Sequence, residues 1–308
     1  MLKLTKSMQA DMANQMCNKA RDIDICIYNT LDGTMPKEFL LDCLTLFETK
    51  DGFARGLHID NYNVNTSVYQ IYEALRLLDM LGFDSSSKED LYIKIVNKCF
   101  NYLYNRAEFK DNKWNPNVKT NDDYAHAKIY SYTDENKLLF GYHPTASILG
   151  YTLVLCDKNK AYYKKALRLI PIVINDYLNK NEFNKYEHIS FLSLYHSLIK
   201  TNSYIELQDK LKNKLINDAK NNISLDFKDY NNLHPLDLAF DLDDELFNDS
   251  INLELDHLIN SIKSFGLWDY DGSWGYDKYP EEDSAKLKWI GAITVKNYFY
   301  LKKYGRIE

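Results

Sequence analysis

The chain has 308 residues, of which 45% are hydrophobic and 27% are charged, so we expect a folded globular protein rather than a disordered one. The formal net charge of −6 argues against the basic surface of a nucleic-acid-binding protein. No run of about 18 apolar residues occurs, and the first residues lack the apolar core of a signal peptide, so we expect no membrane span.

Helical periodicity dominates the chain. In 68–81, apolar residues recur on one helix face, and 160–177 repeats this pattern with Pro171 inside it, which predicts a kink or a break there. In chain order, we expect helices over roughly 8–29, 36–47, 68–81, 88–105, 144–156, 160–177, 187–200, 204–221, 234–240, 246–264 and 283–303. About eleven helices with mostly short connections predict an all-α fold of stacked helical hairpins, in one domain spanning 1–308.

The cysteines and tyrosines add little about function. The five cysteines are odd in number and lack Cys-x-x-Cys or Cys/His metal spacing, so we expect free, mostly buried thiols and a cytoplasmic location. We discount the 25 tyrosines as a sign of binding, because an AT-rich genome inflates Tyr, Lys, Asn and Ile alike. The cysteines are Cys17, Cys26, Cys43, Cys99 and Cys156.

A turn signal recurs three times, at Asp51-Gly52, Asp111-Asn112 and Asp271-Gly272. Gly and Asn are the residues that most readily take positive φ, so we expect one type of turn at all three sites. A turn that recurs between helical segments predicts a repeat architecture.

The residues around these turns resemble the QW repeat, Gln-x-x-x-Gly-x-Trp, of terpene cyclases and protein prenyltransferase β-subunits. Gly272 and Trp274 match that pattern, with Trp268 in place of the Gln. Trp114 matches it with Glu108 and Asn112 as replacements, whereas 48–54 keeps Glu48 and Gly52 but has Ala54 in place of the Trp. The stretches 46–81 and 121–155 and the closing segment 289–308 also resemble bacterial prenyltransferase/squalene-oxidase repeat proteins, so the resemblance covers most of the chain.

This resemblance implies an α/α toroid of five or six helical hairpins around a central cavity. It also implies a structural role for the turn tryptophans, which stack on a neighbouring hairpin in such toroids.

The segment 240–244 matches the Asp-x-Asp-Asp signature of class II terpene cyclases, including squalene–hopene cyclases. In that family the middle acid, here Asp243, protonates an alkene or epoxide, and Asp241 and Asp244 would tune its acidity. Alternatively, these acids cap a helix that starts near Glu245. Class II cyclases usually enclose their substrate between two helical domains, whereas we expect one domain here.

Metal-dependent chemistry finds little support in the sequence. Protein prenyltransferases hold zinc with an Asp, a Cys and a His, and no Asp-x-Cys occurs near a matching His here, so we do not expect zinc. The Asp-Asp-x-x-Asp motif of class I enzymes is also absent. Asp122, Asp123 and His126 leave a magnesium–diphosphate site open as an alternative.

Two further segments combine groups suited to ligand binding. The first places Asp51, Arg55, His58 and Asp60 within eleven residues, where Arg55 can bind a carboxylate or phosphate; the alternative is a surface turn with a local ion pair. The second is the long irregular stretch 107–142 with its exit at His143-Pro144, which we expect to begin a helix. Its candidate ligand-binding residues are Trp114, Asp122, Asp123, His126, Tyr142 and His143.

Three functions remain open. The first is a terpene-cyclase-like or prenyltransferase-like protein that binds an isoprenoid in a toroid cavity and cyclises it by acid initiation. The second is a carbohydrate-active α/α-toroid hydrolase or lyase that uses acids of 51–60 and 122–126. The third is a non-catalytic protein that binds a small molecule. No nucleophile elbow, Walker loop, dinucleotide fingerprint or His-Glu-x-x-His occurs, which disfavours those chemistries.

Overall fold

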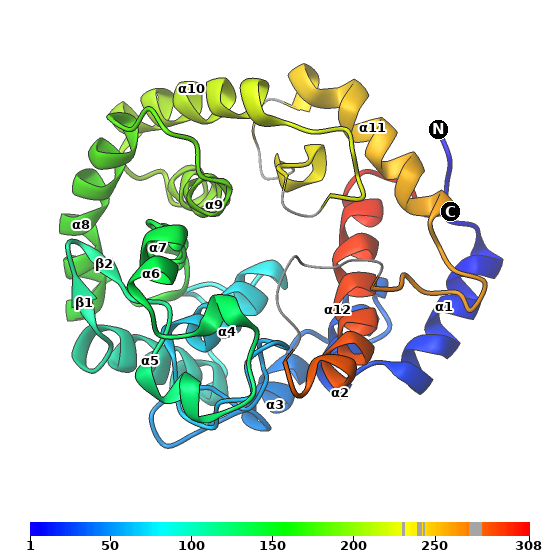
Figure 1. Cartoon of the computed structure of the whole chain (residues 1–308), viewed down its shortest axis with the longest axis horizontal. Helices are drawn as coiled ribbons and strands as arrows, with labels where there is room; N and C mark the ends of the chain where they lie inside the picture. The colour runs from blue at the N-terminus through cyan, green and yellow to red at the C-terminus, as the bar shows by residue number, and fades with distance from the viewer. Residues whose placement is uncertain (230–231, 239–241, 243, 271–278) are drawn as a thin grey trace. The chain divides into compact units, whose positions relative to one another are not determined.

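The structure is a computed structural model, and it describes residues 1–229, 232–238, 242, 244–270 and 279–308. Within these residues the fold is all-α, with twelve α-helices, three short 3-10 helices and one two-stranded hairpin (Figure 1). The all-α prediction is confirmed. Within the same residues, no single helix is long and apolar enough to cross a membrane.

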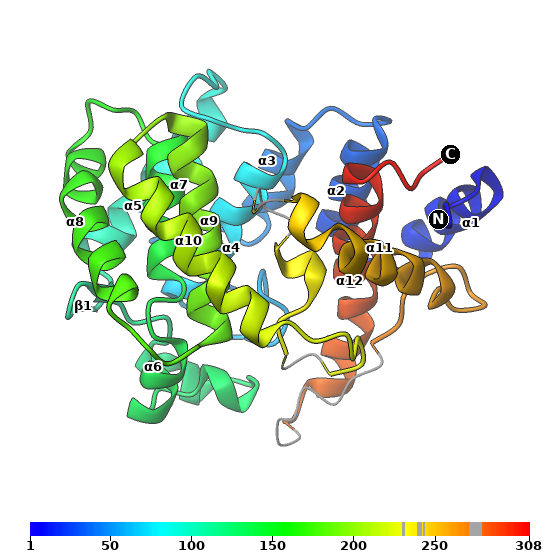
Figure 2. The ribbon, with the colours of Figure 1, turned by 90° about the horizontal axis from the view of Figure 1, so that it is seen from above.

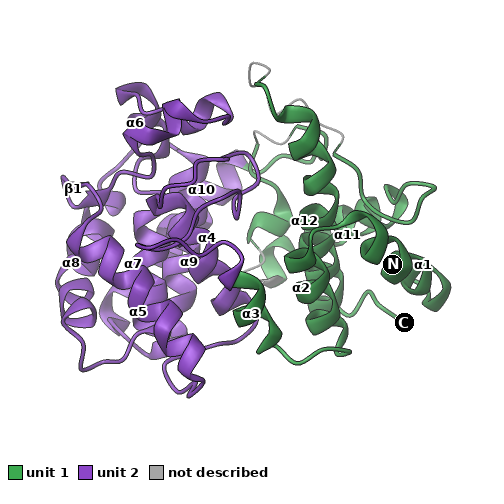
Figure 3. Cartoon of the chain, turned by 90° about the horizontal axis from the view of Figure 1, so that it is seen from below, with its two compact units in different colours: residues 1–44, 223–308 green, residues 45–222 purple. Residues whose placement is uncertain are grey.

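The chain divides into two compact units (Figure 3). Unit 2 is the continuous stretch 45–222, whereas unit 1 combines 1–44 with 223–308. The expectation of one domain over 1–308 stays a prediction.

Unit 2 is built from three helical hairpins, each with an inner and an outer helix. The inner helices α4, α7 and α9 pack side by side, and α5, α8 and α10 pack on them from outside (Figure 1; Figure 2). All eleven residues of α7 are buried, as expected of a helix between other helices. The bounds are α4 (Val68–Met80), α5 (Asp90–Asn105), α7 (Thr145–Leu155), α8 (Ala161–Leu178), α9 (Lys185–Thr201) and α10 (Ile205–Asn222).

The close packing of α7 on α9 depends on Gly150. A Cβ atom at this position would lie 2.6 Å from Oγ of Ser197 and 3.2 Å from the Cα of Leu194. Because backbone atoms cannot move away as a flexible side chain can, a larger residue would push the two helices apart.

Unit 1 contains α1 (Lys6–Lys19), α2 (Asp22–Asp32), most of α3 (Phe39–Thr45), α11 (Asp244–Asn260) and α12 (Glu282–Lys303). Helix α12 packs against α2, α1 and α11. Near the two ends of the chain, Leu4 pairs with Ile307 in a parallel bridge, so this unit joins segments far apart in sequence. Trp268 is 3% exposed, and its indole donates to the carbonyl of Leu258 (2.9 Å).

Three helix predictions need correction. The helix expected over 8–29 is two helices, because Ala20 and Arg21 are extended and Arg21 instead pairs with Asp24 in the first turn of α2. The stretch 107–142 contains an additional helix, α6 (Asp134–Phe140). Within 234–240, the described residues form only a short 3-10 helix, η3 (Pro235–Leu238).

Helix α8 runs through Pro171 without a break. A proline has no N–H, so it leaves the carbonyl four residues earlier, that of Leu167, without its helical donor. The hydroxyl of Tyr204 donates a hydrogen bond to this carbonyl. A tertiary contact thus replaces the missing helical bond, which explains why the predicted break does not occur.

The expectation of a single turn type is wrong for one of the two turns that the structure describes. Asp111 and Asn112 both have positive φ and connect β1 (Phe109–Lys110) to β2 (Lys113–Trp114), as expected. Gly52 does not have positive φ. It is needed because a Cβ would lie 2.6 Å from Cγ2 of Thr66 and 2.7 Å from Cδ1 of Ile71. The third turn, Asp271-Gly272, and Trp274 lie outside the described residues.

Candidate functional site

The segment 51–60 splits into surface and interior groups. Asp51 forms an ion pair with Arg106 (Oδ1 to Nη1, 2.7 Å), and Arg55 is exposed with positive φ. His58 is half-buried, while Asp60 is buried and its backbone carbonyl accepts a hydrogen bond from the amide of Ala127 (2.9 Å). His58 and Asp60 therefore lie next to the loop that contains Ala127 and Tyr130.

Buried asparagines join these two loops. Asn61 forms a backbone bridge with His126, and the side-chain amides of Asn61 and Asn63 both donate to Oδ1 of Asn121 (3.3 and 2.8 Å). Asn121 in turn donates to the backbone carbonyl of Tyr130 (2.7 Å). Because buried polar groups are costly to leave unpaired, these mutually satisfied amides fix one arrangement of the loops.

Gln70 attaches the same loops to helix α4. It is fully buried, its Oε1 accepts from the amide of His58 (2.8 Å), and its Nε2 donates to the carbonyl of Asn61 (3.1 Å). The backbone of His58 is therefore held by Gln70, the residue that follows Tyr69 on α4.

Two histidines and two tyrosines lie in contact with one another. Nε2 of His58 lies 3.2 Å from the hydroxyl of Tyr130, and the ring of Tyr130 lies 5.1 Å from that of Tyr69, measured between centroids. The Tyr69 hydroxyl lies 3.1 Å from Nε2 of His143. We refer to His58, Tyr69, Tyr130 and His143 as the His–Tyr cluster.

Further aromatic rings surround this cluster. The ring of Tyr72 lies 5.1 Å from that of His143, Phe140 lies 5.8 Å from Tyr69, and Tyr186 lies 6.0 Å from His143, measured between centroids. Most of these contacts are tilted or edge-to-face, the arrangement that the charge distribution of aromatic rings favours. The inner helices α4, α7 and α9 or the residues just before them thus share one aromatic surface.

His143 and Tyr69 are both uncharged at neutral pH. Burial, together with the nearby imidazole of His58, lowers the pKa of His143 to about 3, so this ring is neutral. Burial also raises the pKa of Tyr69 well above its usual value. Among the described residues, Nδ1 of His143 has no hydrogen-bond partner although it is buried. A neutral imidazole can both accept and donate a hydrogen bond.

A charged pair lies one turn further along α4. The guanidinium of Arg76 donates to both carboxylate oxygens of Glu73, from Nε at 3.0 Å and from Nη2 at 2.5 Å. Both side chains are part-exposed. An arginine held in this planar geometry can exchange its partner for the carboxylate of a ligand.

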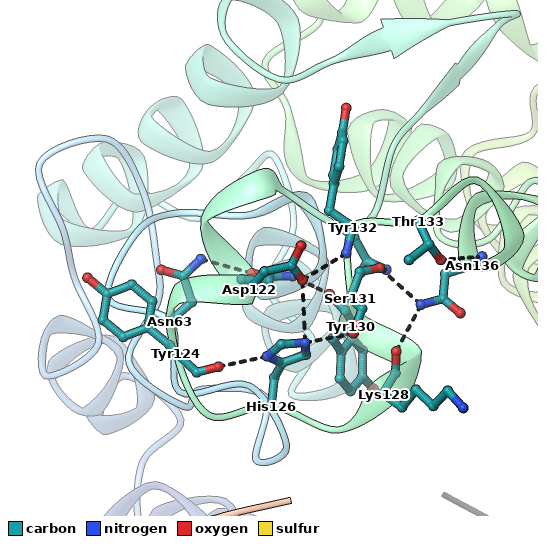
Figure 4. A network of polar contacts seen from close by, with 12 residues as sticks. Asn63, Asp122, Tyr124, His126, Lys128, Tyr130, Ser131, Tyr132, Thr133 and Asn136 are labelled. Carbon is teal, nitrogen blue, oxygen red and sulfur yellow. Dashed lines mark hydrogen bonds and ion pairs between the residues drawn. The ribbon is translucent and has the colours of Figure 1, made fainter. Parts of the chain in front are cut away.

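The remaining residues of the 107–142 stretch have structural contacts (Figure 4). His126 lies 2.7 Å from the carbonyl of Tyr124 and 2.9 Å from Oγ of Ser131, with Oδ1 of Asp122 at 3.7 Å. Asp122 also accepts from the amide of Tyr132 (3.2 Å), and Asp123 is exposed. These groups hold the loop closed on itself.

Two aromatic candidates lie apart from the cluster. Trp114 is buried, and its indole donates to the carbonyl of Leu103 (2.7 Å). The hydroxyl of Tyr142 donates to Oδ2 of Asp176 (2.5 Å), and its amide donates to Glu187 (2.8 Å). Of the residues expected to bind a ligand, only His58 and His143 belong to the His–Tyr cluster, while Asp122 and His126 lie near each other in the loop.

The Asp-x-Asp-Asp segment is largely beyond what the structure covers. Asp241 and Asp243 lie outside the described residues, and Asp244 begins α11 without a described side chain. Among the described residues, no group of three or more His, Cys, Asp or Glu side chains could hold a metal ion.

Comparison with family models, curated proteins and solved structures gave no match to this chain.

Sequence reasoning missed half of the His–Tyr cluster and the residues that hold it. Tyr69 and Tyr130 were hidden among 25 tyrosines that codon bias explains. Two signals were available. Gln70 is a polar residue at a position that helix packing buries, and Asn61, Asn63 and Asn65 alternate just before α4. Polar residues in such places indicate a buried hydrogen-bond network rather than a solvated loop.

Proposed function

We propose that this protein is a terpene-cyclase-like or prenyltransferase-like helical-repeat protein that binds an isoprenoid against the aromatic surface of unit 2. The observation that carries the proposal is the neutral aromatic surface around Tyr69, Tyr72 and His143. Apolar rings exclude water, and their faces stabilise carbocations at short range. An isoprenoid chain, apolar in the ground state and cationic during cyclisation, suits such a surface.

The finer parts of this proposal rest on the resemblance. In it, the hairpins belong to an α/α toroid with a central cavity. Asp243 gives its proton to an alkene carbon, and Asp241 and Asp244 tune its acidity. Magnesium is needed only if the substrate is a diphosphate.

A product assay tests this function. The purified protein is incubated with linear isoprenoids and their diphosphates, with and without magnesium, and extracts are analysed by gas chromatography–mass spectrometry. We expect a cyclic product that is lost in Asp243→Asn and kept in Asp249→Asn, a matched change at an exposed position of α11. Formation of the same product by Asp243→Asn would remove this residue from the mechanism.

The aromatic surface needs a separate variant pair. Tyr72→Phe keeps the ring face, whereas Tyr72→Leu removes it and keeps an apolar side chain, so only the second should lower product yield if the ring stabilises a cation. Equal yields from both variants would argue against this role. No product from any substrate would exclude the cyclase function.

The second candidate is a carbohydrate lyase, favoured by one observation: Tyr69 of the His–Tyr cluster lies one turn before the Arg76–Glu73 pair on α4. Elimination from an acidic sugar needs a group to bind its carboxylate, a base to remove the adjacent proton and an acid to protonate the leaving oxygen. Arg76 and the His–Tyr cluster offer these groups. Incubation with acidic polysaccharides would produce an unsaturated sugar that absorbs ultraviolet light. If both assays fail, the non-catalytic binding function remains.

A further inference from the structure

A groove lies on the surface of unit 2, apart from the His–Tyr cluster. It has a volume of about 820 Å³ and is formed by the turn at 50–51, the outer helix α5 and the start of α8. This size is within the range of about 300–1,000 Å³ found for small-molecule sites.

The charge of the groove is opposite to that of the whole chain. Four cationic side chains line it, those of Lys50, Lys98, Arg106 and Lys160, against the single carboxylate of Asp51, which gives a formal charge of +3. The chain as a whole carries −6. A concave surface with one sign of charge concentrates ligands of the opposite sign.

Two further features favour an anion. Asn97, Asn101 and Asn105 recur every four residues on α5, so their side-chain amides share the helix face that lines the groove. Helix α8 has 18 residues and begins in the groove at Ala161, and its N-cap residue Lys160 makes no side-chain capping hydrogen bond. The start of a helix presents backbone N–H groups and a partial positive charge.

The existing ion pair is one that a ligand can replace. Asp51 and Arg106 are 2.7 Å apart, but their side chains are 36% and 51% exposed, and exposed pairs contribute little stability. Within the described part of the chain, no ion pair engages Lys50 or Lys160. Lys98 is engaged by Glu48 and adds its charge from the groove wall. A bound anion would therefore gain Arg106, Lys160 and the amides of α8.

We propose that this groove binds the phosphate or diphosphate group of a small molecule. The planar guanidinium of Arg106 holds two phosphate oxygens, Lys160 and the first amides of α8 hold the others, and the half-buried ring of Tyr162 packs against the organic part of the ligand. The site is independent of the proposed function, because none of its residues belongs to the His–Tyr cluster.

Titration calorimetry with inorganic pyrophosphate tests the site, since this probe carries the charge without an organic part. We expect saturable binding to the wild type that Arg106→Ala/Lys160→Ala weakens at least about tenfold, because the double variant removes charge-assisted hydrogen bonds to the phosphate oxygens. The matched control is Lys210→Ala/Lys220→Ala on α10, which removes two charges from exposed positions outside the groove and should leave binding unchanged.

A variant that binds pyrophosphate more tightly than the wild type shows an effect that misfolding cannot produce. Asp51→Asn keeps the shape and removes the only competing carboxylate of the groove, so it should tighten pyrophosphate binding. In ¹H–¹⁵N spectra of the full chain, the amides of Ala161 and Tyr162 should shift on titration. The proposal is overturned if pyrophosphate does not bind, if the control double variant weakens binding equally, or if Asp51→Asn weakens it.

Discussion

The hydroxyl oxygen of Tyr69, on α4, lies 3.1 Å from Nε2 of His143, just before α7. Both side chains are buried, at 8% and 5% exposure, so each supplies the other's hydrogen-bond partner in a place that water reaches poorly. This pair connects α4 to the segment just before α7, and the ring of His58 lies 4.8 Å from that of Tyr69, measured between centroids.

Removal of the Tyr69 hydroxyl should destabilise the protein. Tyr69→Phe leaves His143 buried without this partner, which costs about 1–3 kcal/mol of unfolding free energy. Urea denaturation followed by circular dichroism measures the change. Tyr124→Phe, at an exposed position, is the control and should be neutral. Equal stability of wild type and Tyr69→Phe would show that the hydrogen bond contributes nothing net.

His143 should make stability depend on pH. The pKa of His143 is about 3 in the folded protein, whereas its ordinary value is 6.5. Between these two pH values the unfolded chain binds a proton at His143 and the folded protein does not. The stability from this group is complete above pH 6.5 and is lost as pH falls from 6.5 toward 3.

The expected contribution is a slope of up to about 1.4 kcal/mol per pH unit in this window. Because His58 and Glu73 also act on this imidazole, the comparison is between wild type and His143→Gln, measured by urea denaturation at several pH values. The variant should show a shallower slope. Identical slopes would contradict a depressed pKa.

Tyr204 and Pro171 should be energetically coupled. Tyr204→Phe removes the donor to the Leu167 carbonyl and should cost about 1 kcal/mol or more. In the background of Pro171→Ala, the alanine N–H satisfies that carbonyl, so the same Tyr204→Phe change should cost less. A double-mutant cycle by chemical denaturation gives the coupling energy between the two positions. Additive effects would show that the Tyr204 hydrogen bond does not replace the helical hydrogen bond that Pro171 lacks.

A side chain at Gly52 should destabilise the protein unless a neighbouring side chain is made smaller. Gly52→Ala brings a methyl group against Thr66 and Ile71 and should destabilise the protein by about 1–3 kcal/mol. Adding Ile71→Val removes one of the two contacts and should recover part of this loss relative to Ile71→Val alone. Thermal and urea unfolding of the four proteins tests the steric reason; no recovery would point to another cause.

The sequence predicted the helices well where periodicity and length agree, as in 68–81 against α4 and 204–221 against α10. It failed where a tertiary contact decides the local structure. The sequence around Pro171 does not predict the hydrogen bond from Tyr204. The sequence around Gly52 likewise does not predict that the side chains of Thr66 and Ile71 lie close to it.

Only half of the His–Tyr cluster was predicted from the sequence, because tertiary contacts also define this cluster. His58 and His143 stood out because histidine is rare in this chain, with seven in total. Tyr69 and Tyr130 did not, since a tyrosine gains its role only from the partner that the fold brings to its hydroxyl. Residue type identified the scarce members of the cluster, and three-dimensional proximity was needed for the common ones.

The division of the chain has a consequence for biosynthesis. Residues 45–222 form one continuous unit, so a ribosome delivers all of its parts before residue 223 is made. The first 44 residues belong with 223–308, and α2 must therefore wait for α12 before its apolar face is covered. During that interval the nascent chain exposes a helix surface that holds Ile23, Ile27 and Tyr28 in the finished protein, which is the kind of surface that chaperones bind.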